Sequence, residues 1–404
     1  MGCGASAEAP EKRQEPQKPK VEKAAAAEEA AKAAEEDEGE LKMSGKGPEV
    51  GAAIAAIADK HRYDRLDISK CELAEVPDSA WTLKNLTALN VNENRLNNIG
   101  HIAEFKADLQ YLDISDNALG LLHPAIGQFG KLHTLYAFKC GLTAVPPELF
   151  KLTSLTDLNL FNNAIIKVPV ELKELTALKE LNLASNKLMQ LPAGCLDGLK
   201  SLRRLAAFWN RILRLPSFES LEALEELQLN SNQLQEVPTF GTHPRLKDVN
   251  LQKNQISKIP EGIYTAAKFP VLESLELGSN QLEELPCDIA GLPSLTRLSL
   301  AENKLALLPV GLYQSKSLTL LNISNNAIEA LPDEISNLKD NLATLFCANN
   351  KIKTLPASMQ TLAKLARFNC KGNPLDLKDA TTNGVYESIK KQINDPKKFE
   401  GVPA

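Results

Sequence analysis

The sequence predicts an α/β solenoid: a horseshoe of about fourteen repeats, with a parallel inner sheet and a cap at each end. Three observations support this fold class. A short pattern of leucines recurs along most of the chain, one asparagine follows each pattern, and the spacing between patterns is nearly constant. The pattern is clearest between Leu155 and Pro169, where Leu155, Leu158 and Leu160 precede Asn163.

The asparagine position recurs at a regular period. Its fourteen occupants are Cys71, Asn94, Asn117, Cys140, Asn163, Asn186, Asn210, Asn232, Asn254, Asn280, Asn303, Asn326, Asn350 and Asn373. Successive positions are 22 to 26 residues apart and most are 23 apart, which is the period of leucine-rich repeats. One repeat cannot bury its own leucines, so neighbours must stack into a long sheet whose curved inner surface is suited to binding.

The residue types within one repeat have physical reasons. Leu158 and Leu160 alternate as in a short strand with one buried side, and Asn163 follows where the chain turns. An asparagine amide both donates and accepts hydrogen bonds, so stacked asparagines can satisfy backbone groups that the turn leaves open. Leucine-proline pairs such as Leu191-Pro192 then begin the return segment, because proline has no N–H to donate to a further strand.

We expect four segments along the chain. They are a disordered acylated spacer at 1–50, an N-terminal cap at 51–62, the repeats at 63–376, and a C-terminal cap helix and tail at 377–404. The spacer is rich in alanine, glutamate and proline with almost no large apolar residue, so it cannot offset its own ordering entropy. Residues at helical spacing in the two caps are Ile54 and Ile57, and Val385, Tyr386, Ile389 and Ile393.

The first six residues fit an N-myristoylation pattern. Gly2 is the acceptor after methionine removal, Ser6 is at the favoured position, and Cys3 is placed for palmitoylation. One myristoyl chain binds membranes only marginally, and the lysines that follow are interleaved with glutamates, so we expect Cys3 to supply the second signal.

The same features predict the compartment. No apolar stretch reaches the 18 residues of a membrane span, and no cluster of cysteines flanks the repeats as in many extracellular solenoids. We therefore expect a cytoplasmic protein, peripheral on the inner face of a membrane, with acyl chains in the lipid.

No catalytic constellation is present in the sequence. The five histidines are scattered, and none is paired with cysteines at zinc-ligand spacing. We expect no enzyme activity, no cofactor and no metal. The net charge of −5 shows no basic excess, so we expect no nucleic-acid partner, and we expect a monomer.

The candidate binding site lies on the strand face. Residues four, two and one before each asparagine should point to or border the concave surface, and most repeats have small or polar groups there. The exceptions are aromatic: Tyr111, one step earlier on its own strand, and Tyr136, Phe138, Phe161, Phe208 and Trp209. Arg204 and Arg211 flank them. Such a patch fits a protein partner. The alternative is that some rings fold against neighbouring strands and only stiffen the sheet.

A second, smaller candidate combines Phe346 with Arg367 and Lys371.

The repeats also resemble a known group. The pattern at Leu178 to Pro192 and Leu295 to Pro309 resembles the leucine-rich repeats of intracellular proteins related to Ras suppressor and of plant intracellular Ras-group-related proteins. Gly372-Asn373-Pro374-Leu375 and the helix that follows are similar to the terminus of leucine-rich repeat-containing protein 40. The resemblance implies a horseshoe that binds proteins, often in small-GTPase signalling. Ile99 and Ile102 resemble repeats of phosphatase-regulating solenoids.

These observations predict a non-enzymatic scaffold or adaptor that is tethered to a membrane and presents its concave face to a protein, with small-GTPase signalling as the setting. Two alternatives stay open. One is a regulatory subunit of a phosphatase or small GTPase, and the other is a structural linker between membrane and cytoskeleton.

Overall fold

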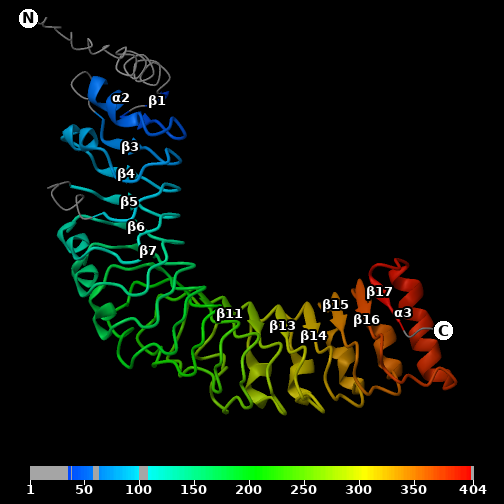
Figure 1. The fold of residues 1–404 in the computed structure, drawn as a ribbon. Helices are drawn as coiled ribbons and strands as arrows, with labels where there is room; N and C mark the ends of the chain where they lie inside the picture. The colour runs from blue at the N-terminus through cyan, green and yellow to red at the C-terminus, as the bar shows by residue number, and fades with distance from the viewer. Residues whose placement is uncertain (1–34, 38, 58–62, 100–107, 402–404) are drawn as a thin grey trace, which may run out of the picture.

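The chain is described by a computed structural model that covers residues 35–37, 39–57, 63–99 and 108–401. These residues form one curved solenoid with helix α3 at its C-terminal end (Figure 1). Gly2 and Cys3, the predicted acylation sites, lie outside the described residues, as does Ile102.

Seventeen strands are present in the described part of the chain. The N-terminal group is β1 (Glu35–Asp37), β2 (Glu40–Lys42), β3 (Arg65–Asp67), β4 (Ala88–Asn90), β5 (Tyr111–Asp113), β6 (Thr134–Tyr136), β7 (Asp157–Asn159), β8 (Glu180–Asn182) and β9 (Arg204–Ala206). The C-terminal group is β10 (Glu226–Gln228), β11 (Asp248–Asn250), β12 (Ser274–Glu276), β13 (Arg297–Ser299), β14 (Leu320–Asn322), β15 (Thr344–Phe346), β16 (Arg367–Asn369) and β17 (Phe399–Glu400).

All these strands belong to one sheet. Strand β1 pairs antiparallel with β2, and from β2 to β17 each strand pairs parallel with the next along the chain. The central leucines stay in register, so Leu158 lies beside Leu181, which lies beside Leu205, and all three are buried. The predicted parallel inner sheet and the fourteen repeats are therefore confirmed, with one strand for each repeat from β3 to β16.

The asparagine ladder has the structural role that the sequence predicts. Asn186 is buried; its Oδ1 accepts a hydrogen bond from the Ile165 N–H at 3.0 Å, and its Nδ2 donates to the carbonyls of Leu160 and Leu183 at 2.9 and 3.0 Å. Each amide thus links two successive repeats. Where cysteine replaces asparagine, the thiol keeps part of this role, since the Sγ of Cys140 donates to the Ile114 carbonyl at 3.2 Å.

Short helices and turns form the outer curve (Figure 1). The 3₁₀ helices are η1 (Asp78–Thr82), η3 (Pro124–Gln128), η4 (Pro147–Lys151), η5 (Val170–Glu174), η6 (Cys287–Gly291), η7 (Val310–Gln314), η8 (Asp333–Leu338) and η9 (Ala357–Thr361). Pro286, Pro309 and Pro332, each preceded by leucine, are examples of the extended residue before such a helix. This placement agrees with the prediction that Leu-Pro begins the return segment.

The N-terminal end differs from the predicted boundaries. Strand β2 pairs with β3 and buries Leu41 and Met43, so the sheet begins inside the range 1–50 that the sequence assigned to the spacer. Helix α2 (Val50–Ile57) follows β2 and packs against η1, with Ile54 buried. This helix is the outer segment of an additional first repeat rather than a cap placed before the solenoid.

The C-terminal end carries the predicted helix and one further strand. Helix α3 (Ala380–Ile393) buries Val385, Tyr386 and Ile389, and Asp379 caps it by accepting a hydrogen bond from the Thr382 N–H. Strand β17 then extends the sheet beside β16. Among the described helices, none is long and apolar enough to cross a bilayer.

Candidate functional site

The concave face over β5 to β9 is built from rows of side chains at matching positions. The first row is Tyr111, Thr134, Asp157, Glu180 and Arg204, and the second row is Asp113, Tyr136, Asn159, Asn182 and Ala206. A third row follows two residues after the strands and contains Ser115, Phe138, Phe161, Ala184 and Phe208. Five of the six predicted aromatic residues lie in these rows, and the sixth, Trp209, directly follows Phe208 at their border. We call the six residues the aromatic patch: Tyr111, Tyr136, Phe138, Phe161, Phe208 and Trp209.

Two tyrosines form the N-terminal part of the aromatic patch. The rings of Tyr111 and Tyr136 meet edge to face, with centroids 5.8 Å apart and planes at 77°. Burial raises the pKa of both hydroxyls, and nearby Asp113 and Asp157 add to the effect. Both tyrosines therefore stay protonated over the whole neutral range, and the Tyr111 hydroxyl is hydrogen-bonded to Asp113 within the fold.

Phe161 and Phe208 meet although a whole repeat separates their strands. Their ring centroids are 6.4 Å apart, and the residue between them in the third row is Ala184, which is fully buried. A larger side chain at Ala184 would hold the rings apart. The two rings therefore form one continuous apolar surface across β7, β8 and β9.

Trp209 extends this surface to the edge of the solenoid. Its side chain is 57% exposed, and its ring packs edge to face against Phe208 with centroids 5.4 Å apart. The residue before each ladder position adopts a left-handed backbone, and Trp209 has φ of 53°. Asparagine and other short polar residues tolerate this conformation, whereas a bulky residue is strained in it. Lys139 and Lys253 adopt the same backbone in other repeats, so the conformation belongs to the repeat, and the feature that distinguishes Trp209 is its large exposed indole.

Charged residues beside the aromatic patch occupy different environments. Arg204 forms ion pairs with Glu180 at 2.9 Å and Glu226 at 3.5 Å, so it lies in the middle of the face and is already paired. Lys139 pairs with Asp116 at 3.2 Å and lies 6.0 Å from the ring centre of Phe138.

Two further charged residues, Asp113 and Arg211, present no charge over the open face, although Asp113 belongs to the second row. Asp113 is buried, and its carboxylate accepts hydrogen bonds from the Ser115 N–H and the Asn92 amide. Arg211 is exposed but follows Asn210, so it lies on the lateral edge rather than over the sheet.

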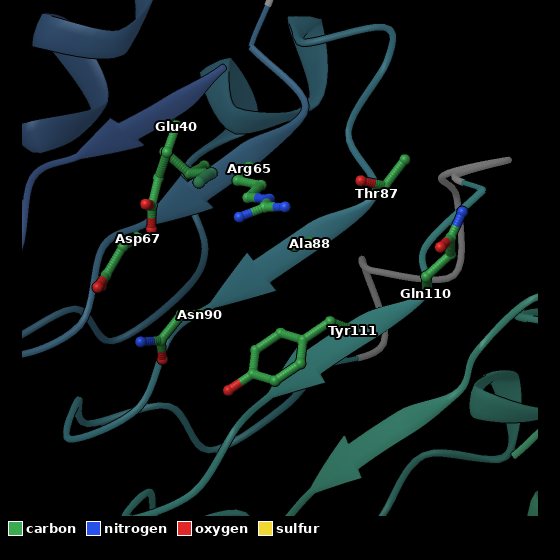
Figure 2. Close-up of a pocket in the computed structure, with 9 residues that line it drawn as sticks. Glu40, Arg65, Asp67, Thr87, Ala88, Asn90, Gln110 and Tyr111 are labelled. Atoms are coloured by element: carbon green, nitrogen blue, oxygen red, sulfur yellow. The ribbon is translucent and has the colours of Figure 1, made fainter. Parts of the chain in front are cut away.

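Small residues between long ones hollow the concave face. A hollow of about 410 Å³ lies where Ala88 separates Arg65 from Tyr111 in the first row. Figure 2 shows Arg65 on β3 and Tyr111 on β5, with β4 between them. A second hollow of about 170 Å³ lies beside Tyr136 and Arg204, above the small Ala206. These open hollows of mixed polarity suit side chains of a partner better than an enclosed small molecule.

The second candidate lies near the C-terminal end. Phe346 is half-buried on β15, while Arg367 on β16 and Lys371 are exposed. No ring contact of Phe346 with another described aromatic residue extends this group into a patch.

The sequence analysis did not single out a row of exposed apolar residues on the lateral edge. Ile166, Met189 and Leu213 each stand three residues after a ladder asparagine, and all are exposed. Their common offset from the ladder was the signal available in the sequence. Among the described residues, no group of histidine, cysteine, aspartate and glutamate side chains is arranged to hold a metal ion.

Comparisons with known proteins agree with the solenoid. The family model of the leucine-rich repeat matches residues 130–188, 244–305 and 317–338. Together with the sheet and the asparagine ladder, these matches define a protein with a leucine-rich-repeat fold. No curated protein sequence matches the chain.

Solved structures share this architecture over most of the chain. A leucine-rich-repeat protein of Leptospira interrogans is 29% identical with a TM-score of 0.61, covering 88% of this chain and 98% of its own. An internalin of Listeria monocytogenes is 22% identical with a TM-score of 0.60, covering 82% of this chain and 90% of its own. The Arabidopsis receptor kinase HAESA, solved with the peptide hormone IDA and the co-receptor SERK1, is 23% identical with a TM-score of 0.53, covering 80% of this chain and 56% of its own.

Proposed function

We propose that this chain is a non-enzymatic scaffold that holds a protein partner against the aromatic patch while acyl groups on Gly2 and Cys3 hold it at the cytoplasmic face of a membrane. The observation that carries the binding half is Trp209, an exposed indole continuous with Phe208 and Phe161. Large aromatic side chains next to an arginine are the usual anchors of protein interfaces.

The charge on the same face indicates how a partner would be oriented. Acidic Asp157 and Glu180 stand beside Arg204, so the face is mixed in sign rather than uniformly basic or acidic. A protein surface can match such a pattern, whereas a nucleic-acid backbone cannot, because all its charges are negative. The peptide ligand of HAESA gives a precedent for a protein ligand on this fold.

The partner class that we put first is a small GTPase, on the resemblance of the repeats to Ras suppressor and plant intracellular Ras-group-related proteins. A regulatory subunit of a phosphatase or GTPase and a membrane–cytoskeleton linker are the alternatives. The identity of the bound protein separates the three.

The test is affinity capture from native cell extract with the full chain and with a variant in which Tyr136, Phe138, Phe161, Phe208 and Trp209 are all changed to serine. A control changes Leu121, Leu307 and Val310, exposed apolar side chains outside both candidate sites, to serine. Circular dichroism must first show that all three proteins are folded. We expect the same proteins on the parent and control and their loss from the patch variant; equal capture by all three would refute the patch as the interface.

A further inference from the structure

One lateral edge of the solenoid has a composition that differs from the rest of the molecule. Over four successive repeats, the residues from one before to four after the ladder position are 139–144, 162–167, 185–190 and 209–214. These segments contain five cations and no aspartate or glutamate, although the whole chain has a net charge of −5. The cations are Lys139, Lys167, Lys187, Arg211 and Arg214.

Apolar side chains stand among these cations. Ile166 and Met189 are each 55% exposed and Leu213 is 40% exposed. All three occupy the same offset from the ladder in adjacent repeats. We call these three residues and the five cations the basic edge.

The loops of the basic edge run side by side, so its residues form a line. The Leu213 N–H donates to the Met189 carbonyl at 3.1 Å, and the Lys187 N–H donates to the Ile165 carbonyl at 2.9 Å. Repeats spaced like neighbouring strands place the four loops along about 15 Å. The three apolar side chains therefore follow one another along the lateral edge as an apolar ridge, and Leu213 also lines a hollow of about 140 Å³ toward the next repeat.

Most of the charge on the basic edge is not neutralised within the fold. Lys139 is paired with Asp116, but in the part of the chain that the structure describes, Lys167, Lys187, Arg211 and Arg214 form no ion pair. Four unpaired cations around three exposed apolar side chains favour a partner that is anionic at its surface and apolar beneath that surface. An anionic lipid bilayer has both properties.

We propose that the basic edge is a membrane-docking surface that binds anionic lipid bilayers directly. The apolar ridge separates this assignment from a nucleic-acid site, because a phosphodiester chain offers nothing to bury Ile166, Met189 and Leu213. The single sign of charge separates it from the concave face, where Asp157, Glu180 and Arg204 mix signs as protein interfaces do. Trp209 stands at the junction of the two surfaces, and tryptophan is enriched at the membrane–water interface.

This inference deepens the membrane half of the proposed function. A single myristoyl chain binds membranes marginally, and a basic patch is one of the second signals that make attachment stable. The N-terminal spacer at 1–50 has eight basic and twelve acidic residues and is therefore net acidic, so the folded domain is the part that supplies such a patch. With the edge on the bilayer, the concave aromatic patch faces sideways and stays open to a partner.

The test uses the full chain with Gly2→Ala, so that no acyl chain contributes. We measure co-sedimentation with phosphatidylcholine vesicles that contain or lack phosphatidylserine. Besides this parent protein, two variants are tested. The first removes four cations (Lys167→Gln/Lys187→Gln/Arg211→Gln/Arg214→Gln), and the second removes the apolar side chains (Ile166→Ser/Met189→Ser/Leu213→Ser). The matched controls are Lys253→Gln/Lys304→Gln/Lys351→Gln/Lys353→Gln, with equal charge change on other exposed edge positions, and Leu121→Ser/Leu307→Ser/Val310→Ser.

We expect binding only to the vesicles with phosphatidylserine, weaker at high salt. Each cation near such a surface changes affinity about fivefold, so the four-cation variant should lose at least about tenfold while its control changes less than about threefold. The serine variant of the ridge should also lose binding. In a Trp81→Phe background, Trp209 fluorescence should shift to the blue on adding the anionic vesicles.

Two results would overturn the assignment. One is no binding of the parent protein to anionic vesicles, and the other is equal binding by the edge variants and their controls. Binding of a single-stranded RNA or an acidic peptide that depends on the same cations, without vesicle binding, would assign the edge to that partner instead. None of these outcomes affects the capture test of the aromatic patch, because that test uses no membrane.

Discussion

Trp209 packs edge to face against Phe208, with ring centroids 5.4 Å apart and planes at 79°, although the backbone of Trp209 is left-handed with φ of 53°. The same position holds Asn162 and Ser185 in the two preceding repeats, both with left-handed φ. All fourteen repeats are left-handed at this position, and long side chains such as Lys139 and Lys253 also occupy it, so the repeat imposes this backbone on whichever residue stands there.

Replacing Trp209 with asparagine should abolish partner binding while leaving the stability of the fold nearly unchanged. The left-handed strain that is relieved and the aromatic contact that is lost are each about 1 kcal/mol, so the free energy of unfolding should change by less than about 1 kcal/mol. Trp209→Ala loses the contact but keeps most of the strain and should destabilise by about 1 kcal/mol. Chemical denaturation measures stability, and capture from extract measures binding; both variants should lose the partner alike. If Trp209→Asn still captures the partner, Trp209 is not part of the interface.

The asparagine ladder predicts that different substitutions of Asn186 lower the free energy of unfolding by different amounts. Asn186→Ala leaves the Ile165 N–H and the carbonyls of Leu160 and Leu183 without this partner in a buried site, which should cost about 2 to 4 kcal/mol. Asn186→Cys should cost less, because the chain already uses a thiol at Cys140 to donate to the Ile114 carbonyl. The unfolding midpoints in urea of both variants and the parent give the comparison, and a larger loss for cysteine than for alanine would contradict it.

The repeat period predicted the solenoid well because each ladder asparagine must bond to two neighbouring repeats, which fixes its identity and spacing. The extra first repeat was missed for the same reason. Strand β2 carries Leu41 and Met43, but the position equivalent to the ladder asparagine holds Lys46. The pattern at an end of a solenoid is incomplete because the terminal repeat has only one stacked neighbour to bond.

The sequence was enough to predict that the residues of the aromatic patch share a face. It was not enough to predict which of their side chains touch. Alternation along a strand placed the six aromatic side chains on the concave side. It did not show that Phe161 meets Phe208 across a whole repeat, which depends on the small Ala184 between them. It also did not show that Arg204 is already paired with Glu180 and Glu226, because that depends on side chains of three neighbouring strands.

The proposed acylation at the N-terminus leads to a prediction in cells. Gly2→Ala should move most of the protein from the membrane to the soluble fraction, because removing the acceptor glycine prevents myristoylation and the palmitoylation that follows. Cell fractionation with intact mass measurement checks both location and acyl mass. Unchanged membrane association of Gly2→Ala would reject acylation as the main tether.

Cys3→Ser isolates the contribution of the basic edge. This variant keeps the myristoyl group and lacks the palmitoyl group, so its residual membrane association needs another signal. This residual membrane association should disappear when Lys167, Lys187, Arg211 and Arg214 are also changed to glutamine. It should persist when the four control lysines on the other repeats are changed instead. Complete release by Cys3→Ser alone would mean that the edge adds little in the cell.

His243 makes the C-terminal half of the solenoid sensitive to acid. It is fully buried where the preceding repeat has Leu221, it stacks on Phe269 with centroids 5.8 Å apart, and its Nδ1 lies 3.0 Å from the Leu221 carbonyl. Burial lowers the pKa of His243 below its ordinary value of 6.5; nearby Lys268 lowers it further, and Glu222 opposes the shift.

The sign of the pH dependence follows from that shift. Below about pH 6.5 the unfolded chain binds a proton at His243 that the folded chain does not, so stability falls as pH falls, by up to about 1.4 kcal/mol per pH unit. His243→Leu removes this group and restores the residue type of the preceding repeat, so its unfolding free energy should depend less on pH between 6.5 and 5. Urea denaturation at several pH values measures the slope for the parent, for His243→Leu and for His133→Gln, in which an exposed histidine is removed. The parent and His133→Gln should share one slope, and a slope unchanged in His243→Leu would show that other groups cause the acid sensitivity.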